Sequence, residues 1–257
     1  MNRRLNYLWR VLATGWCFLS FSLGGLLLTL TVFPFIRLTT RDPARRRTRT
    51  QRAIQRSFRI FIGQMCRLGV MSVELHNADR LSAADGHLVL ANHPTLIDVV
   101  LMISLMPRAD CVVKDALWHN RFLGGVVRAA GYISNSTPER LVADCAGAVA
   151  SDRPLIIFPE GTRTTPGAPL KFQRGAAHIA LQAGRPLLPV VLDCRPSTLT
   201  KDLRWYQIPE RRFHVTLKVL DPIALSSLVD TREPAPLAAR HLTAALEQFF
   251  TREMLKT

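Results

Sequence analysis

The longest apolar pattern in the chain is an uncharged run over residues 11–36, which is 26 residues long. As a helix rising about 1.5 Å per residue it would reach roughly 39 Å, more than a bilayer core of about 30 Å. We therefore predict a membrane anchor with basic flanks over residues 1–43. A cleaved signal peptide is the main alternative, but its apolar region usually has about 7 to 15 residues. Whether the anchor spans the bilayer or folds back near Gly24 and Gly25 stays open.

The next segment, residues 44–70, is predicted to form a basic amphipathic helix. Its apolar residues recur at three- and four-residue steps, which is typical of one helix face. The stripe comprises Ile54, Phe58, Phe61, Ile62, Met65 and Leu68, and it is opposed by Arg49, Arg52, Arg56 and Arg59. Two interpretations are open: the stripe lies on anionic lipid, or it packs into the protein core and the arginines face water.

From residue 71 onward, short β-rich runs alternate with helical ones. Strands are predicted at 72–76, 87–91, 111–113, 154–158, 186–192 and 213–220, and helices near 95–106, 116–129, 138–150, 172–183 and 234–255. Such alternation favours an α/β fold with a mostly parallel, helix-flanked sheet. We expect residues 71–257 to form one domain.

The net charge of +15 changes this picture only at the front of the chain. Residues 1–67 hold thirteen arginines, no lysine and a single acid, Asp42, so they carry +12 of that charge. Most of these arginines follow the apolar run, and such a bias places the following domain in the cytoplasm. We therefore expect an inner or plasma membrane protein that binds membrane lipid and no nucleic acid. A membrane-tethered nucleic-acid binder remains the alternative from another class, although the chain has no recognition motif.

The first candidate site follows the predicted strand 87–91. His93 at the strand end and Asp98 after four intervening residues can meet across a tight turn, where a helix is predicted to open at Pro94 or Thr95. The carboxylate would then bond one ring nitrogen and leave the other basic, so the pair could deprotonate a hydroxyl. A loop histidine that caps its helix is the alternative.

The second candidate site follows the predicted strand 154–158. The run Pro159-Glu160-Gly161-Thr162-Arg163 puts a carboxylate, a glycine, a hydroxyl and a guanidinium at a strand end, where open α/β sheets bind ligands. Arg163 can hold a phosphate through two parallel hydrogen bonds, and Glu160 can fix that arginine or a substrate hydroxyl. A surface turn with an ion pair is the alternative.

Taken together, these two stretches resemble the glycerolipid acyltransferase family, which includes lysophosphatidic acid and glycerol-3-phosphate acyltransferases. In that family a His-x4-Asp block is the catalytic pair, and a Phe-Pro-Glu-Gly-Thr-Arg block, here Phe158 to Arg163, binds the acceptor phosphate. The resemblance covers about residues 70–220. It extends to the block around Arg174 that follows, and to the segment from Lys114 to Ile133 that shapes the acyl and acceptor sites.

Two positions depart from the family pattern. Arg121 stands where proline is common, and Ser134-Asn135-Ser136 stands where an arginine often follows Gly-x-Ile. Either Arg121 or Arg128 takes over phosphate binding, or the acceptor is a different, non-glycerophosphate lipid.

The resemblance implies an O-acyltransferase of phospholipid synthesis. It would move a fatty acyl group from acyl carrier protein or coenzyme A to a lysophospholipid hydroxyl, with no bound cofactor and no metal. Acyl carrier protein is then a possible partner. A related protein that binds lipid without turnover is a further alternative. The chain contains no Gly-x-Ser-x-Gly elbow and no Gly-Lys dipeptide, which argues against a serine hydrolase and a phosphate-loop enzyme.

Overall fold

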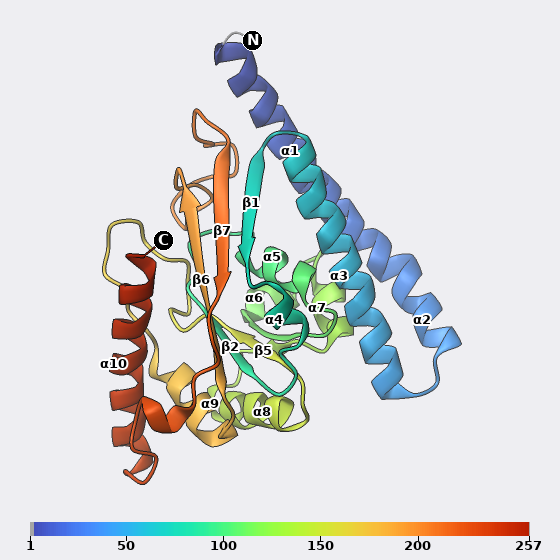
Figure 1. Cartoon of the computed structure of the whole chain (residues 1–257). Coiled ribbons are helices and arrows are strands. Elements are labelled where there is room, and N and C mark those ends of the chain that lie inside the picture. The colour runs from blue at the N-terminus through green and yellow to red at the C-terminus, as the bar shows by residue number, and fades with distance from the viewer. Residues whose placement is uncertain (1–2, 257) are drawn as a thin grey trace.

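A computed structural model describes residues 3–256 and builds them around a seven-stranded sheet (Figure 1). The strand order across the sheet is β1-β7-β6-β2-β5-β3-β4. β6 and β7 pair antiparallel, and the five other neighbouring pairs within residues 3–256 are parallel. The predicted mostly parallel sheet is therefore confirmed. The strands are β1 (Met71–His76), β2 (Leu88–Ala91), β3 (Asp110–Val113), β4 (Ile133–Ser134), β5 (Leu155–Ile157), β6 (Leu187–Arg195) and β7 (Phe213–Val219).

Helices cover both faces of this sheet. Val89 and Ala91 of β2 join a core that includes α3, α5 and α7, while Leu88 and Leu90 of the same strand join a core with α8, α9 and α10. Side chains of a strand point alternately to its two faces, so one short apolar strand serves both cores. The helices are α1 (Arg3–Leu27), η1 (Leu28–Val32), α2 (Phe33–Thr39), α3 (Pro43–Arg67), α4 (Asp79–Ser82), α5 (Asp98–Leu105), α6 (Asp115–Trp118), α7 (Gly124–Ala130), α8 (Pro138–Ala150), α9 (Arg174–Ala183), η2 (Leu225–Ser227) and α10 (Ala235–Met254).

The segment between β3 and β4 differs from the prediction. The single helix expected over 116–129 is divided into α6 and α7, and the two-residue strand β4 was not predicted. The side chain of Asn120 accepts hydrogen bonds from the backbone amides of Phe122 and Leu123, which closes a turn where the helix would have continued. Gly124 then lies against the Trp118 carbonyl, where a Cβ atom would come within 2.5 Å.

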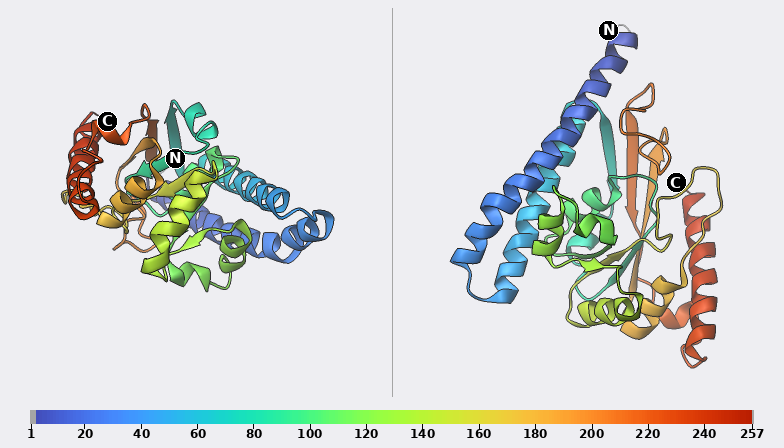
Figure 2. Two further views of the ribbon diagram at one scale, coloured as in Figure 1. Left: turned by 90° about the horizontal axis from the view of Figure 1, so that it is seen from below. Right: turned by 180° about the vertical axis from the view of Figure 1, so that it is seen from behind.

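The N-terminal segment forms one continuous helix from Arg3 to Thr39, with a π-helical stretch at η1. It runs through Gly24 and Gly25 without folding back. Within residues 3–256 it is the one helix long and apolar enough to cross a membrane. One of its faces lies along the rest of the chain, with α3 returning beside it (Figure 2). A Cβ atom added to Gly125 would come within 2.3 Å of the Thr29 side chain, so this packing is close.

The basic amphipathic helix is present as α3, and its apolar stripe is buried. Asp42 caps its N-terminus by accepting from the amides of Ala44 and Arg45, and Pro43 occupies the first turn. The stripe residues Ile54, Phe58, Phe61, Ile62 and Met65 all belong to the core shared with α5 and α7. The interpretation in which this stripe lies on lipid is therefore wrong, because the same side chains fill the protein interior.

Candidate active site

The position of His93 is set first by the residue before it. Asn92 is fully buried at the end of β2, and its side chain continues the sheet pairing with β6. Its Nδ2 donates to the Leu192 carbonyl at 2.7 Å, and its Oδ1 accepts from the Leu192 amide at 2.8 Å. An amide side chain that mimics a peptide group fixes the backbone as it leaves the strand, so His93 emerges in a defined direction.

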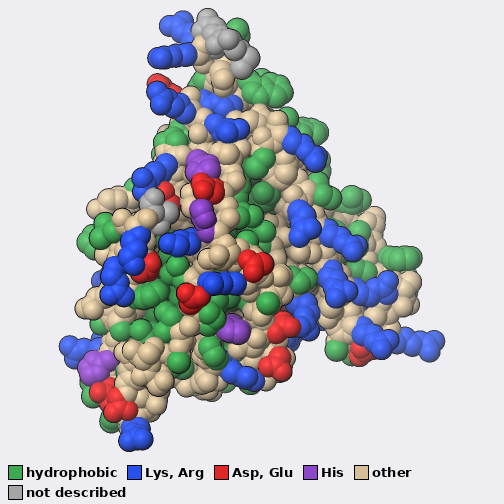
Figure 3. All heavy atoms as spheres, viewed as in Figure 1, with side chains coloured by type: hydrophobic (Ala, Val, Ile, Leu, Met, Phe, Trp, Pro, Cys, Tyr) green, Lys and Arg blue, Asp and Glu red, His purple; other side chains and the backbone are tan. Residues whose placement is uncertain are grey.

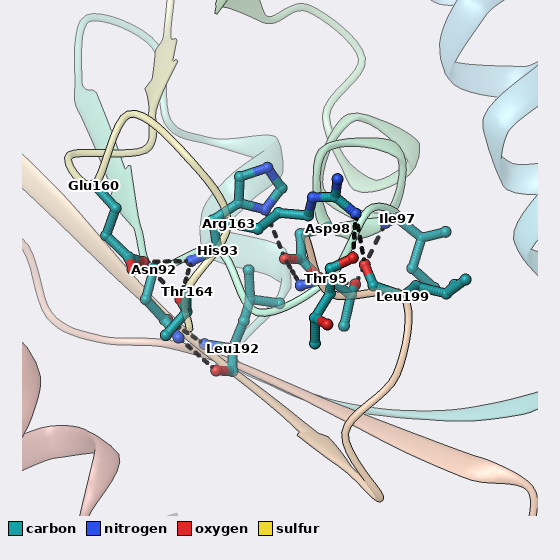
Figure 4. A network of polar contacts seen from close by, with 11 residues as sticks. Asn92, His93, Thr95, Ile97, Asp98, Glu160, Arg163, Thr164, Leu192 and Leu199 are labelled. Carbon is teal, nitrogen blue, oxygen red and sulfur yellow. Dashed lines mark hydrogen bonds and ion pairs between the residues drawn. The ribbon is translucent and has the colours of Figure 1, made fainter. Parts of the chain in front are cut away.

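The other side of His93 is held by the loop that follows β5. Glu160 Oε1 accepts from the His93 amide at 2.9 Å, and the Thr164 amide donates to the His93 carbonyl at 2.7 Å. The Thr164 hydroxyl donates to the same Glu160 oxygen at 2.7 Å. β2 and β5 are parallel neighbours, so their C-terminal loops meet at one edge of the sheet. Figure 4 shows this network around His93.

The imidazole of His93 is oriented by Asp98. The ring Nδ1 lies 2.8 Å from Asp98 Oδ2, and the ring stacks on Phe158 with centroids 4.2 Å apart. An ionised carboxylate only accepts hydrogen bonds, so Nδ1 carries the proton and Nε2 has a free lone pair. The His93 side chain is 16% exposed and that of Asp98 is 0% exposed. The pair can therefore take a proton from a hydroxyl that approaches Nε2.

The helix after His93 begins later than the sequence predicts. α5 opens at Asp98 itself rather than at Pro94 or Thr95. The Asp98 carboxylate accepts from both the amide and the hydroxyl of Thr95, and these bonds draw residues 95–97 into a turn ahead of the helix. A carboxylate in the first turn is also favoured by the helix dipole.

The guanidinium of Arg163 is held by two backbone carbonyls. Its Nη1 donates to Leu199 at 2.9 Å and to Thr200 at 2.7 Å. The Leu199 carbonyl also accepts from the Leu96 amide, in the turn between His93 and Asp98. Both N–H groups of Nη1 are thus used, while Nη2 and Nε have no hydrogen-bond partner within residues 3–256 and can form the two-pronged face that binds a phosphate.

Of the two partners predicted for Glu160, Arg163 is wrong. The Glu160 carboxylate bonds the His93 amide and the Thr164 hydroxyl, whereas the Arg163 guanidinium bonds the Leu199 and Thr200 carbonyls. Burial raises the pKa of Glu160, whereas the bonds from Thr164 and from the His93 backbone lower it. Glu160 therefore holds the loop that carries His93.

The remaining predicted residues lie around this centre. Gly161 has a left-handed backbone with φ of 67°, which favours glycine, and it lies close to Gln173 just before α9. Thr162 is half-buried, and Arg174 is exposed in the first turn of α9. Lys114 is exposed at the end of β3, a parallel neighbour of β5.

The two arginines considered as substitutes for the missing one differ in their surroundings. Arg128 Nη1 donates to the Trp118 carbonyl and so ties α7 to α6. Arg121 is exposed in the loop between these helices.

Three polar residues of the site were not singled out from the sequence. Asn92, Thr95 and Thr164 each bond to the backbone or side chains that hold His93 and Asp98. The signal was available for both Asn92 and Thr95, because Thr95 lies within the His-x4-Asp block and Asn92 lies immediately before it. Thr164 lies just beyond the second block, and its role depends on the tertiary contact between the two loops.

A mostly parallel α/β sheet with a histidine–aspartate pair and an arginine at its C-terminal edge fits the acyltransferase class. Residues 72–193 match the family described as Acyltransferase. The mouse 1-acyl-sn-glycerol-3-phosphate acyltransferase alpha is 26% identical over 170 residues, which cover 63% of this chain and 59% of that protein. A protein of Caenorhabditis elegans described as a putative 1-acyl-sn-glycerol-3-phosphate acyltransferase is 31% identical over 175 residues, 62% of this chain and 59% of that one.

A solved structure shares the fold. The crystal structure of the 1-acyl-sn-glycerophosphate acyltransferase PlsC from Thermotoga maritima superposes with a TM-score of 0.67 at 18% identity, covering 96% of this chain and 98% of that one. Residues 72–193 therefore belong to the Acyltransferase family, and the named relatives support a glycerolipid acyltransferase family for the chain. The chain spans about six tenths of the length of the animal relatives named above.

We expect His93→Ala to lose about 10²- to 10⁴-fold in turnover while its melting temperature stays close to that of the unchanged protein. Asp98→Asn should lose less, because its carbonyl can still accept at the Oδ2 position and its amide can donate to the Thr95 hydroxyl. Steady-state kinetics and thermal unfolding of both variants test this. Near-normal turnover of His93→Ala would remove it as the base, and a large loss of stability would make the pair structural.

Glu160→Gln should keep most of the activity, because a carboxamide oxygen can still accept from the His93 amide and the Thr164 hydroxyl. Glu160→Ala loses both bonds, and a displaced base should cost about ten- to hundredfold in kcat. The two variants are compared at saturating substrates. Equal losses in both would show that the negative charge itself acts on substrate.

Proposed function

We propose that the chain is an acyl thioester-dependent O-acyltransferase of phospholipid synthesis that acylates a lysophospholipid-like acceptor, with 1-acylglycerol-3-phosphate as the expected acceptor. The observation that carries this proposal is the His93–Asp98 pair, whose turn shares the Leu199 carbonyl with Arg163. That arrangement brings a base for a hydroxyl and a cation for a phosphate to one sheet edge. The names of the relatives, 1-acyl-sn-glycerol-3-phosphate acyltransferases, support the same acceptor.

The proposed chemistry is a direct transfer that needs only side chains of this chain. His93 Nε2 removes the proton of the acceptor hydroxyl as its oxygen bonds to the thioester carbonyl carbon. The tetrahedral intermediate collapses when its C–S bond breaks, and the leaving thiolate accepts that proton from the imidazolium. Asp98 stabilises that imidazolium and keeps Nε2 directed at the substrate. The donor is an acyl thioester of acyl carrier protein or coenzyme A.

Several nearby residues are proposed to bind the acceptor and donor. Arg163 would bind the acceptor phosphate through Nη2 and Nε, and Gly161 and Thr162 would let the backbone approach it. Lys114 and Arg174, both exposed near the same sheet edge, would add positive charge for the phosphates of the substrates. Glu160 acts indirectly, through the loop of His93.

The helix from Arg3 to Thr39 is proposed to anchor the chain in a membrane. Large apolar side chains recur along its outer face at three- and four-residue steps, with Leu12 70% exposed, Trp16 56% and Leu30 65%. An apolar stripe of this length on a surface marks an interaction site. The opposite face, including Ala13 and Cys17, is buried against the rest of the chain. A helix with one face on the protein and one outside fits an in-plane position at the lipid surface better than a crossing.

Positive charge lies on α3, the helix that packs beside α1. Figure 3 shows Lys and Arg side chains gathered over α3, where Arg52, Arg56 and Arg59 are exposed. Anionic headgroups attract such a face, at about 1 kcal/mol for each arginine near the surface. We therefore propose the cytoplasmic face of the inner or plasma membrane as the location. Membrane lipid, rather than nucleic acid, would be the polyanionic partner.

Arg163→Ala should raise the acceptor KM about ten- to hundredfold while the thioester KM changes little, because one charge-assisted bidentate contact is lost. Arg163→Lys should recover only part of this, since an ammonium lacks the planar fork. Initial rates at varied acceptor and fixed thioester measure both constants. An unchanged acceptor KM would remove Arg163 from the site and favour a lipid acceptor without phosphate.

Replacing Leu12 and Leu19 by glutamate should weaken binding to phosphatidylglycerol-containing vesicles about tenfold or more, because two apolar side chains no longer enter the lipid. Leu237→Glu on α10, at an apolar position 40% exposed, is the matched control and should bind normally. Vesicle co-sedimentation at low and high salt measures the partition. Release of the unchanged protein by salt alone would show that arginines, not the stripe, hold it.

A further inference from the structure

The loop between β6 and β7, residues 196–212, contacts both the N-terminal helix and the active site. In Figure 1 it lies at the upper end of the molecule, the end at which α1 begins. It carries exposed Leu203, Trp205 and Tyr206 in its middle. The two contacts lie on different parts of the loop.

The first contact is with Arg163. The Leu199 and Thr200 carbonyls hold Nη1 of the arginine, and both residues are buried, 2% and 5% exposed. Leu199 has a positive φ of 51°, a conformation that a leucine adopts only where its surroundings impose it. The bonds from Arg163 and from the Leu96 amide both end on its carbonyl. This part of the loop therefore fixes where the guanidinium lies.

The second contact is with Arg10 of α1. Arg10 directly precedes the apolar run, and it is only 4% exposed. Its Nη1 donates to the Pro209 carbonyl at 2.9 Å, its Nη2 to the Glu210 carbonyl, and its Nε to Asn6 Oδ1 at 3.0 Å. A buried charge is tolerated only when its donors are satisfied. Arg10 thus ties the far end of the loop to the helix.

Trp205 adds a packing contact between the same two elements. Its ring lies against Gly15, where a Cβ atom would come within 3.1 Å, and against Phe18, with centroids 6.4 Å apart. The loop is therefore attached to α1 at residues 205–210 and to Arg163 at 199–200, with a few exposed residues between.

We propose that the loop at 196–212 is a positioning element through which α1 controls acceptor binding: α1 holds the loop by Arg10 and Trp205, and the loop holds Arg163. This inference rests on the proposed function, in which Arg163 binds the acceptor and α1 lies on lipid. Arg10 is then a positioning residue that touches no substrate. Displacing α1 from its place should weaken the acceptor site without altering the base.

Arg10→Ala should raise the acceptor KM about three- to thirtyfold and leave the thioester KM unchanged. In Arg10→Ala/Arg163→Ala the effect should be smaller than the product of the single effects, because Arg10 acts through Arg163. Arg211→Ala, which removes an exposed arginine from the same loop, is the matched control and should keep the normal acceptor KM. Equal rises in both KM values, or independent effects in the double variant, would overturn the proposal.

Inserting two glycines between Asp202 and Leu203 provides a second test, which keeps both contacts of the loop. It does not depend on the stability of the Arg10→Ala variant. Asp202 and Leu203 are both exposed, and lengthening a surface loop costs little stability. If the loop transmits the position of α1, the insertion should raise the acceptor KM at an unchanged melting temperature. A normal acceptor KM in the inserted protein would contradict it.

Hydrogen exchange separates this inference from the proposed function. The Leu96 amide is bonded to the Leu199 carbonyl and should exchange about three- to thirtyfold faster in Arg10→Ala than in Arg211→Ala, whatever the reaction is. Absence of acyl transfer in the unchanged protein would refute the proposed function alone. Unaltered exchange at Leu96 in Arg10→Ala would refute the positioning role alone.

Discussion

The buried carboxylate of Asp98 is the group around which the site is organised. A carboxylate that is 0% exposed must be compensated, and here the amide and hydroxyl of Thr95, the ring of His93 and the start of α5 all do so. Those bonds have a direct chemical consequence. They fix the tautomer of His93 and close the turn before α5, so the imidazole is oriented by the same interactions that make the buried charge tolerable.

The order of the strands then determines which loops contact the loop of His93. β2 and β5 are separated by more than sixty residues in the chain, yet they are parallel neighbours, so Glu160 and Thr164 close on the backbone of His93. On the other side of β2, Asn92 bonds to β6, whose following loop reaches Arg163 through Leu199. The loop of His93 therefore lies between the loop after β5 and the loop after β6. The loop after β5 binds the His93 backbone, and the loop after β6 positions Arg163.

The sequence predicted the elements and the two blocks better than it predicted their contacts. Most of the strands are short β-rich runs with clear ends, and His93 and Asp98 meet across a local turn, so short-range rules suffice for both. Glu160 has two possible partners, Arg163 three residues later and the distant His93 amide, and only the tertiary structure favours the second. The stripe of α3 was ambiguous for a similar reason, because core and lipid select the same residues at the same spacing. The two-residue strand β4 is too short to leave a pattern.

The N-terminal helix shows why apolar length does not distinguish a crossing helix from one that lies on a surface. Both faces of Arg3–Thr39 contain apolar residues, and the mean hydropathy of the helix averages over the two faces. What differs between the faces is what they contact. The inner face includes Gly15 against Trp205 and Gly25 against the Phe122 carbonyl, and it includes a buried Arg10 bonded to carbonyls of the same chain. The outer face carries large leucines and tryptophans. A helix that stood away from the domain would lose the bonds from Arg10 to the Pro209 and Glu210 carbonyls, so the arginine that borders the apolar run argues for a helix held along its own protein.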